Sequence, residues 1–274
     1  MVWQLRGKFP DILKDPKLGK EATQLFKDAN HLLDRIEKEN LLTANAVLGF
    51  YPANSVGDDI ELYEDETRKN RLTIFRNLRN QTRKEKGVPN LCLSDFIAPI
   101  DSGRNDYLGV FAVTAGIGIE KVLSEFEKDH DDYNSIMIKA LADRLAEAFT
   151  ELLHLKVRKE YWGFAKDETL SLKDLLLEKY QGIRPAHGYP ACPDHSEKQT
   201  LFNLLNVEEN TGMQLTESFS MIPAASVSGL IFANPESKYF YVGKIGRDQI
   251  KDYAKRKEYP VETVEKLLAT ELNY

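Results

Sequence analysis

Tyr107-Leu108-Gly109-Val110-Phe111-Ala112-Val113-Thr114 is the stretch of this sequence with the strongest strand character. Its residues are almost all apolar instead of alternating with polar ones, which is typical of a strand buried on both faces. The apolar run that contains it ends at Ile119 and is interrupted by glycines. A membrane-spanning helix needs about 18 consecutive apolar residues, and this run is shorter. We therefore expect a central strand of a sheet here, and no membrane span.

The strongest helical pattern covers residues 133–161. Its apolar residues recur at steps of three or four, as they do on one face of a helix; they are Met137, Leu141, Leu145, Ala148, Leu152 and Leu155. At a rise of about 1.5 Å per residue this helix would be roughly 40 Å long, which is about the width of a domain of this size. We therefore predict one long central helix that forms the spine of a single unit and is not a linker.

The other elements follow shorter patterns. Further helices are expected at residues 18–39, 120–128, 172–180, 247–257 and 260–269, and one that runs to Leu205 from a capping box of Asp194 and Glu197. Further strands are expected at residues 46–51, 59–63 and 72–75, with a turn at Pro52-Ala53-Asn54 and a hairpin of residues 227–232 and 239–244. Strands joined by tight turns favour antiparallel pairing. We predict an α+β fold over residues 1–274, a single compact domain with a mainly antiparallel twisted sheet, flanking helices and the long central helix.

The composition is that of an ordinary globular protein. The chain has 274 residues, of which 42% are hydrophobic and 29% are charged. The formal net charge of −6 gives no support for nucleic-acid binding, for which a basic face is expected. Cys92 and Cys192 are too few for a disulfide framework, and residues 1–8 lack the pattern of a signal peptide. These features favour a cytoplasmic protein that contacts neither nucleic acid nor membrane.

Two motifs suggest chemistry but do not meet its requirements. Gly116-Ile117-Gly118 lies between a predicted strand and a predicted helix, but a dinucleotide-binding fingerprint needs a third glycine where this chain has Lys121. His187, Cys192 and His195 are of the types that bind zinc, but their spacing matches no standard zinc pattern. We predict no metal ion and no catalytic residue, and keep a small metal-dependent hydrolase that uses these three residues as a distant alternative.

A loop rich in proline and glycine at residues 182–190 is the most informative segment for function. Pro185 and Pro190 stiffen the backbone, whereas glycines such as Gly188 permit close approach to a ligand. Arg184 is a planar group with several N–H donors, suited to a carboxylate, and Tyr189 offers an aromatic face with a hydroxyl. A rigid loop with these groups could hold a small zwitterionic ligand, or it could equally be a structural connector with a surface arginine.

Two glutamates are candidates to face that loop. Glu147 lies in the long helix between two alanines, and Glu178 lies six residues before Arg184. Either carboxylate could pair with a cationic centre of a ligand or with Arg184. The alternative for both is an acidic side chain on a solvated helix face.

The chain resembles a known family at the following stretches: residues 50–54, 56–60, 93–99, 107–116, 130–133, 142–163, 182–198, 215–229 and 237–241. The most specific of them is Arg-Pro-Ala-x-Gly-Tyr-Pro at residues 184–190. Through these stretches the chain resembles, over essentially its whole length, the C-terminal activation domain of cobalamin-dependent methionine synthase.

The resemblance implies binding of S-adenosylmethionine. In this family the domain presents the methyl donor for reductive methylation of inactive cob(II)alamin, within the enzyme that completes methionine biosynthesis. The family's arginine anchor corresponds to Arg184, its loop backbone contact to Ala186, its tyrosine near ligand and corrin to Tyr189, and its nucleoside-side pair to Tyr239 and Phe240. With Gly188 of the same loop and the two glutamates, these are the predicted ligand-binding residues.

The resemblance also implies partners. The cobalamin belongs to a neighbouring domain of methionine synthase, and flavodoxin or a diflavin reductase supplies the electron. The chain is therefore expected to be part of a methyltransferase without being catalytically competent in isolation.

The sequence departs from the family pattern at two places. Phe240 stands where a tyrosine can occur. An Asp-Trp-x-Pro-Phe-Phe stretch, whose aspartate helps to anchor the ligand, precedes the position of Val2-Trp3 in the family, and Met1 stands in its place here. A second interpretation follows from this, in which the chain is a docking module for the cobalamin domain and the reductase that binds no ligand itself.

Overall fold

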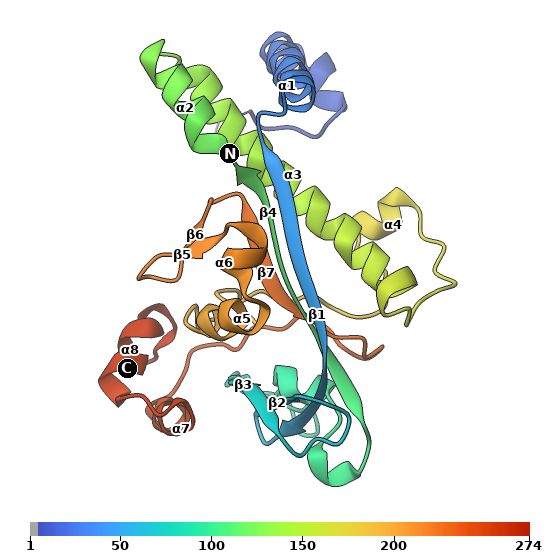
Figure 1. Ribbon diagram of the computed structural model, residues 1–274, viewed down its shortest axis with the longest axis vertical. Coiled ribbons are helices and arrows are strands. Elements are labelled where there is room, and N and C mark those ends of the chain that lie inside the picture. The colour runs from blue at the N-terminus through green and yellow to red at the C-terminus, as the bar shows by residue number, and fades with distance from the viewer. Residues whose placement is uncertain (1–4) are drawn as a thin grey trace.

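Strand β4 (Asp106–Ile117) contains the apolar stretch of residues 107–114 and lies in the interior of a five-stranded sheet. In this computed structural model, which describes residues 5–274, the strand order is β3-β2-β1-β4-β7 and all neighbours are antiparallel. The other strands are β1 (Thr43–Val56), β2 (Asp59–Tyr63), β3 (Arg71–Phe75) and β7 (Ser226–Ile231), with a separate ribbon of β5 (Gln214–Leu215) and β6 (Met221–Ile222). β1 and β4 run side by side along the length of the molecule (Figure 1).

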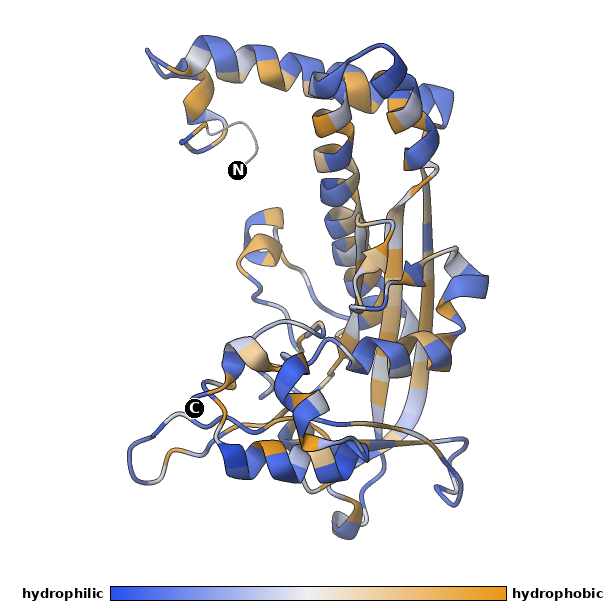
Figure 2. Ribbon diagram, turned by 90° about the vertical axis from the view of Figure 1, so that its left-hand side faces the viewer, coloured by the Kyte–Doolittle hydropathy of each residue, from blue (hydrophilic) through white to orange (hydrophobic). Residues whose placement is uncertain are grey.

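Both faces of β4 are covered, which explains why its sequence is apolar throughout. On one face, Phe111 packs in a cluster with Leu153 of the long helix α3 (Asp132–Lys156). On the other face, Val110 packs in a second cluster with Leu201 of α5 (Glu197–Leu205), and the short α6 (Val207–Thr211) follows α5. The strands of the sheet are coloured largely as hydrophobic in Figure 2, whereas hydrophobic and hydrophilic residues alternate along the helices.

The remaining helices gather at the two ends of the sheet (Figure 1). α1 (Gly19–Glu39) and α2 (Ile119–Lys128) share an apolar cluster with α3 at one end. α7 (Arg247–Lys257) and α8 (Val261–Leu267) build a separate small core towards the other end. The short elements are α4 (Leu172–Leu176) and 3₁₀ turns at Asp11–Lys14, Leu93–Phe96, Ile100–Ser102 and Ala269–Glu271.

The predicted fold class is confirmed. The structure is α+β, its main sheet is antiparallel, and the helical pattern of residues 133–161 corresponds to α3 continued by a π-helical turn at Val157–Tyr161. Among residues 5–274, none of the helices combines the length and the apolar character that a membrane crossing requires.

The predicted hairpin of residues 227–232 and 239–244 is wrong in its second half. β7 pairs with β4 on one edge, and on its other edge Phe232 forms a bridge with Ile183. Because the segment of Ile183 occupies that edge, residues 239–244 cannot pair there, and they form no strand. Instead, Val242 N–H donates to Pro190 O at 2.9 Å, which places this segment beside the loop of Arg184.

The predicted turn at Pro52-Ala53-Asn54 is also wrong, because β1 continues to Val56. Pro52 pairs with Tyr107 of β4, and β2 reaches β1 only from Ala53 onward. The missing N–H of the proline therefore lies where one edge of β1 is unpaired, a position that a strand tolerates. The chain reverses at Gly57, which has a φ of +61°.

Two helix boundaries differ from expectation. The capping box is wrong: Asp194 and Glu197 are buried, and Glu197 Oε2 accepts from the Arg76 N–H at 3.0 Å instead of returning to its own helix end. The helix expected at residues 172–180 ends at Leu176, because the chain turns there and Glu178 adopts a positive φ of +52°.

Candidate functional site: the Arg184 pocket

The first half of the loop that carries Arg184 is attached to the free edge of β7. Ile183 and Phe232 exchange two backbone hydrogen bonds of 3.2 and 2.9 Å, and the Leu230 N–H donates to Pro185 O at 3.0 Å. A Cβ at Gly229 would lie 2.5 Å from Pro185 O, so this close approach of two backbones requires glycine. The position of Arg184 is therefore fixed by the sheet.

The second half of the loop closes on itself. Gly188 N–H donates to Cys192 O at 2.8 Å, and Cys192 N–H donates to Tyr189 O at 2.9 Å. The carbonyl of Ala186 accepts from the Tyr189 N–H at 3.2 Å and from Cys192 Sγ at 3.0 Å. These bonds hold Tyr189 at the surface, where 63% of the residue is exposed.

The loop forms one wall of a pocket of about 370 Å³, opposite α3. Seven of the eight predicted ligand-binding residues line it, together with Thr150, Pro185, Pro190, Ala191 and Val227; the seven are Glu147, Glu178, Arg184, Ala186, Tyr189, Tyr239 and Phe240. The eighth, Gly188, lines a smaller neighbouring pocket that shares Tyr189 and Pro190. The structure therefore brings residues from four separate segments of the chain to one place.

Arg184 is held by groups that the sequence reasoning missed. Its Nη1 donates to Tyr180 Oη at 2.7 Å and lies 3.1 Å from His154 Nδ1, and its Nη2 donates to Glu151. The hydroxyl of Tyr239 accepts from the backbone N–H of Arg184 at 3.1 Å. The guanidinium is thus fixed from the side of α3, while Arg184 also lines the pocket.

The electrostatics make two of these partners neutral. Burial, with the charges of Arg158 and Arg184, lowers the pKa of His154 to about 2, so its Nδ1 accepts a hydrogen bond from Arg184. Burial raises the pKa of Tyr180 to about 12, so its hydroxyl keeps its proton. Glu151 is therefore the one carboxylate that pairs with Arg184 among the described residues.

The missed residues do leave a signal in the sequence. Glu147, Glu151 and His154 follow each other at steps of four and three, so they lie on one face of α3. Glu147, which was predicted, and Glu151, which was not, therefore point in the same general direction. Tyr180 leaves no such signal, because it lies beyond the end of α4.

The zinc-type residues of the hydrolase alternative are engaged elsewhere. His187 is buried and stacks on Phe75 with ring centroids 5.7 Å apart. His195 Nδ1 lies 2.7 Å from Lys198 Nζ, and Cys192 Sγ donates to Ala186 O. In the part of the chain that the structure describes, no group of three or more His, Cys, Asp or Glu residues is placed to hold a metal ion. The geometry gives this alternative no support.

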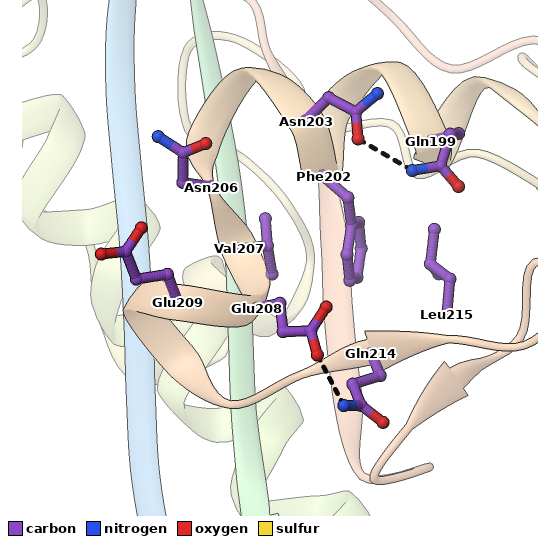
Figure 3. Close-up of a pocket in the computed structure, with 9 residues that line it drawn as sticks. All are labelled: Gln199, Phe202, Asn203, Asn206, Val207, Glu208, Glu209, Gln214 and Leu215. Atoms are coloured by element: carbon purple, nitrogen blue, oxygen red, sulfur yellow. Dashed lines mark hydrogen bonds between the residues drawn. The ribbon is translucent and has the colours of Figure 1, made fainter.

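A larger pocket of about 710 Å³ lies between α5, α6 and β5 (Figure 3). It is lined by Gln199, Phe202, Asn203, Asn206, Val207, Glu208, Glu209, Gln214 and Leu215. Two pairs of its polar groups bond to each other, Gln199 with Asn203 at 2.8 Å and Gln214 with Glu208 at 2.6 Å. This lining contains no cationic side chain, so it offers no charged partner for a ligand carboxylate.

Comparison with known proteins points to one family. The family model described as "Vitamin B12 dependent methionine synthase, activation domain" matches residues 1–258. A crystal structure of the MetH reactivation domain bound to AdoHcy is similar over 100% of this chain and 84% of that chain, with 56% sequence identity and a TM-score of 0.97.

Proposed function

Because the chain belongs to the family of activation domains of vitamin B12-dependent methionine synthase, we propose that its Arg184 pocket binds S-adenosylmethionine and S-adenosylhomocysteine (AdoHcy). The methionine synthase of which such a domain is part is a methyltransferase. In this proposal the chain presents the methyl donor for reductive methylation of the inactive cobalamin, and its own residues bind and orient the donor.

The observation that carries the proposal is the set of side chains around the pocket. S-adenosylmethionine has a carboxylate, an ammonium, a sulfonium and an adenine. Arg184 suits the carboxylate, and the carboxylates of Glu147 and Glu178 suit the cationic centres. Tyr239 and Phe240 offer aromatic faces for the adenine. A volume of about 370 Å³ is within the range of small-molecule sites, about 300–1,000 Å³.

The proposal includes a partner on the open side of the pocket. Tyr189 and Tyr239 are 63% and 44% exposed at its rim, so a second surface can approach a ligand that lies there. We propose the cobalamin-carrying domain of methionine synthase as that surface, and flavodoxin or a diflavin reductase as the source of the electron. The free, buried cysteines Cys92 and Cys192 agree with a reducing, cytoplasmic setting.

Calorimetric titration of AdoHcy and S-adenosylmethionine into the chain tests the proposal. We expect binding, and we expect Arg184→Ala to weaken it by about 1.5–3 kcal/mol, the usual contribution of a charged hydrogen bond. This corresponds to about 10- to 150-fold in the dissociation constant. Arg71→Ala is the matched control, because Arg71 is an exposed arginine of β3 that pairs with Glu61 and is not among the residues that line the pocket.

Unchanged affinity in a folded Arg184→Ala variant would remove Arg184 from the site. A chain extended upstream through the family's aspartate segment is titrated in parallel. Binding by the extended form alone would support the docking-module interpretation for the chain as given, and binding by neither form would refute the proposed ligand.

A further inference from the structure

Arg184 uses only part of its hydrogen-bonding capacity within the protein. Nη1 is engaged by Tyr180 and His154, and one Nη2 hydrogen by Glu151. The Nε hydrogen and the second Nη2 hydrogen have no hydrogen-bond partner within residues 5–274. Nε and Nη2 hydrogens can lie side by side on one edge of a guanidinium, at the spacing of the two oxygens of a carboxylate. The partners that engage Nη1 and one Nη2 hydrogen therefore determine the orientation of the guanidinium, and with it the direction of the two remaining N–H groups.

Tyr180 is held in place by two neighbouring side chains. It is 7% exposed, and the guanidinium carbon of Arg158 lies 4.2 Å from its ring centroid. The ring of His154 meets it edge-on, with centroids 4.9 Å apart and planes at 88°. A phenol ring fixed on one face and one edge holds its hydroxyl in a defined place.

Arg158 in turn is fixed by a buried ion pair. Its side chain is completely buried, and its Nε and Nη2 donate to Glu168 at 3.0 and 2.8 Å. Arg158 lies in the π-helical turn that follows α3, and turns of this kind are frequent near functional sites. Neither Arg158 nor Glu168 lines the pocket, so both act on it through the residues that contact Arg184, namely Tyr180 and, through its charge, His154.

Two of the partners of Arg184, His154 and Tyr180, are uncharged, and this matters for the binding of a ligand carboxylate. The Tyr180 hydroxyl and the His154 imidazole orient Arg184 without compensating its charge. Glu151, the charged partner, keeps 41% of its side chain exposed to solvent, which screens its interaction with Arg184. Much of the attraction of Arg184 for an incoming anion is therefore retained.

On the basis of the proposed function, we propose that Tyr180 is a positioning residue for the carboxylate end of the ligand. Its hydroxyl, clamped through Arg158 and His154, holds the guanidinium of Arg184 so that the two free N–H groups face the pocket. Tyr180 touches no ligand atom in this proposal, and its effect is confined to ligands that carry a carboxylate.

Tyr180→Phe, which removes only the hydroxyl, tests this with two ligands. AdoHcy carries the amino-acid carboxylate, whereas 5′-methylthioadenosine keeps the nucleoside and the thioether but lacks the carboxylate. We expect the affinity for AdoHcy to fall about tenfold, and that for 5′-methylthioadenosine to change less than about twofold. Tyr107→Phe is the control, because it removes a hydroxyl that bonds to Glu66 at the surface.

A double-mutant cycle gives a second measurement. In the Arg184→Ala background, Tyr180→Phe should change AdoHcy affinity no further, because the group that it positions is absent. Equal losses for the two ligands would indicate a general structural role and overturn the inference, as would additive effects in the cycle or no loss for AdoHcy. Failure of the unmodified chain to bind either ligand would instead refute the proposed function.

Discussion

Gly188 combines two constraints that only glycine satisfies. Its φ is +94°, and a Cβ there would lie 2.1 Å from Cε1 of the His195 ring. The first constraint is a property of the backbone, whereas the second arises because His195 packs over the loop. The close packing of the loop at residues 182–190 against His195, seven residues further along the chain, therefore leaves no room for a side chain at position 188.

We expect Gly188→Ala to lower the free energy of unfolding by about 2–3 kcal/mol, as both the backbone strain and the collision with His195 apply. Urea unfolding measures this. Gly103→Ala is the matched control, because Gly103 has a φ of +67° but nothing within 4 Å of its Cβ position, so we expect a cost of about 1 kcal/mol. Equal costs in the two variants would show that the His195 contact contributes nothing.

α3 acts as both a spine and a scaffold for the site. Its apolar face covers the sheet through Leu153, and its polar face presents Glu147, Glu151 and His154 towards the loop. The π-helical turn at its end directs Arg158 into the interior, where Glu168 neutralises it. A buried ion pair therefore fixes the side chain that leaves the end of this helix.

We expect Glu168→Gln to destabilise the protein by about 3–5 kcal/mol, because it leaves the buried guanidinium of Arg158 without its counter-charge. The control is Glu160→Gln in the exposed pair with Lys156, for which a change below about 1 kcal/mol is expected. Thermal and urea unfolding compare the two variants. A small effect of Glu168→Gln would mean that Arg158 is not constrained by its charge, and the clamp on Tyr180 would need another explanation.

The helices α7 and α8 join the rest of the molecule through buried charges. Lys257 of α7 lies 3.0 Å from Asp194 Oδ2 and 2.5 Å from Glu197 Oε1. Tyr253 of the same helix donates to Asp194 at 2.9 Å. Burial alone would lower the pKa of Lys257, but the two carboxylates outweigh it and hold that pKa above its usual value. The segment after the loop at residues 182–190 is thereby bonded to the C-terminal helices.

We expect Lys257→Met to loosen this end of the molecule selectively, since it leaves two buried carboxylates without their cation. Hydrogen exchange should become faster in α7, by at least about tenfold at Ile250 and Tyr253, while α1 and α2 at the other end keep their rates. Lys251→Met, at an exposed position of the same helix, should change nothing. Uniform acceleration through the whole chain would show that both ends unfold as one unit.

The agreement between sequence and structure is greatest where local patterns are strong. The long helix, the central strand and the strands between residues 46 and 75 were predicted from the spacing of apolar residues. Burial of one or both faces of an element requires apolar residues at regular positions along it, and this spacing is visible in the sequence. The second half of the hairpin failed because strand pairing depends on which edge is free, and residues 183–185 occupy the edge of β7. The capping box was wrong because Glu197 bonds to distant residues and does not return to the helix end, and because Asp194, besides bonding to Ser196, pairs with Lys257.

The sequence predicts the binding chemistry of the loop at residues 184–190, since the residue types define what a rigid loop can bind, and the family resemblance suggests the ligand. The convergence of Glu147, Glu178, Tyr239 and Phe240 on that loop depends on the fold, because contacts between segments far apart in the chain leave no local pattern. The same holds for Glu151, His154 and Tyr180 around Arg184. Local patterns specify which groups the chain carries, whereas only the packing of α3 and the loop on opposite sides of the pocket determines which of them meet.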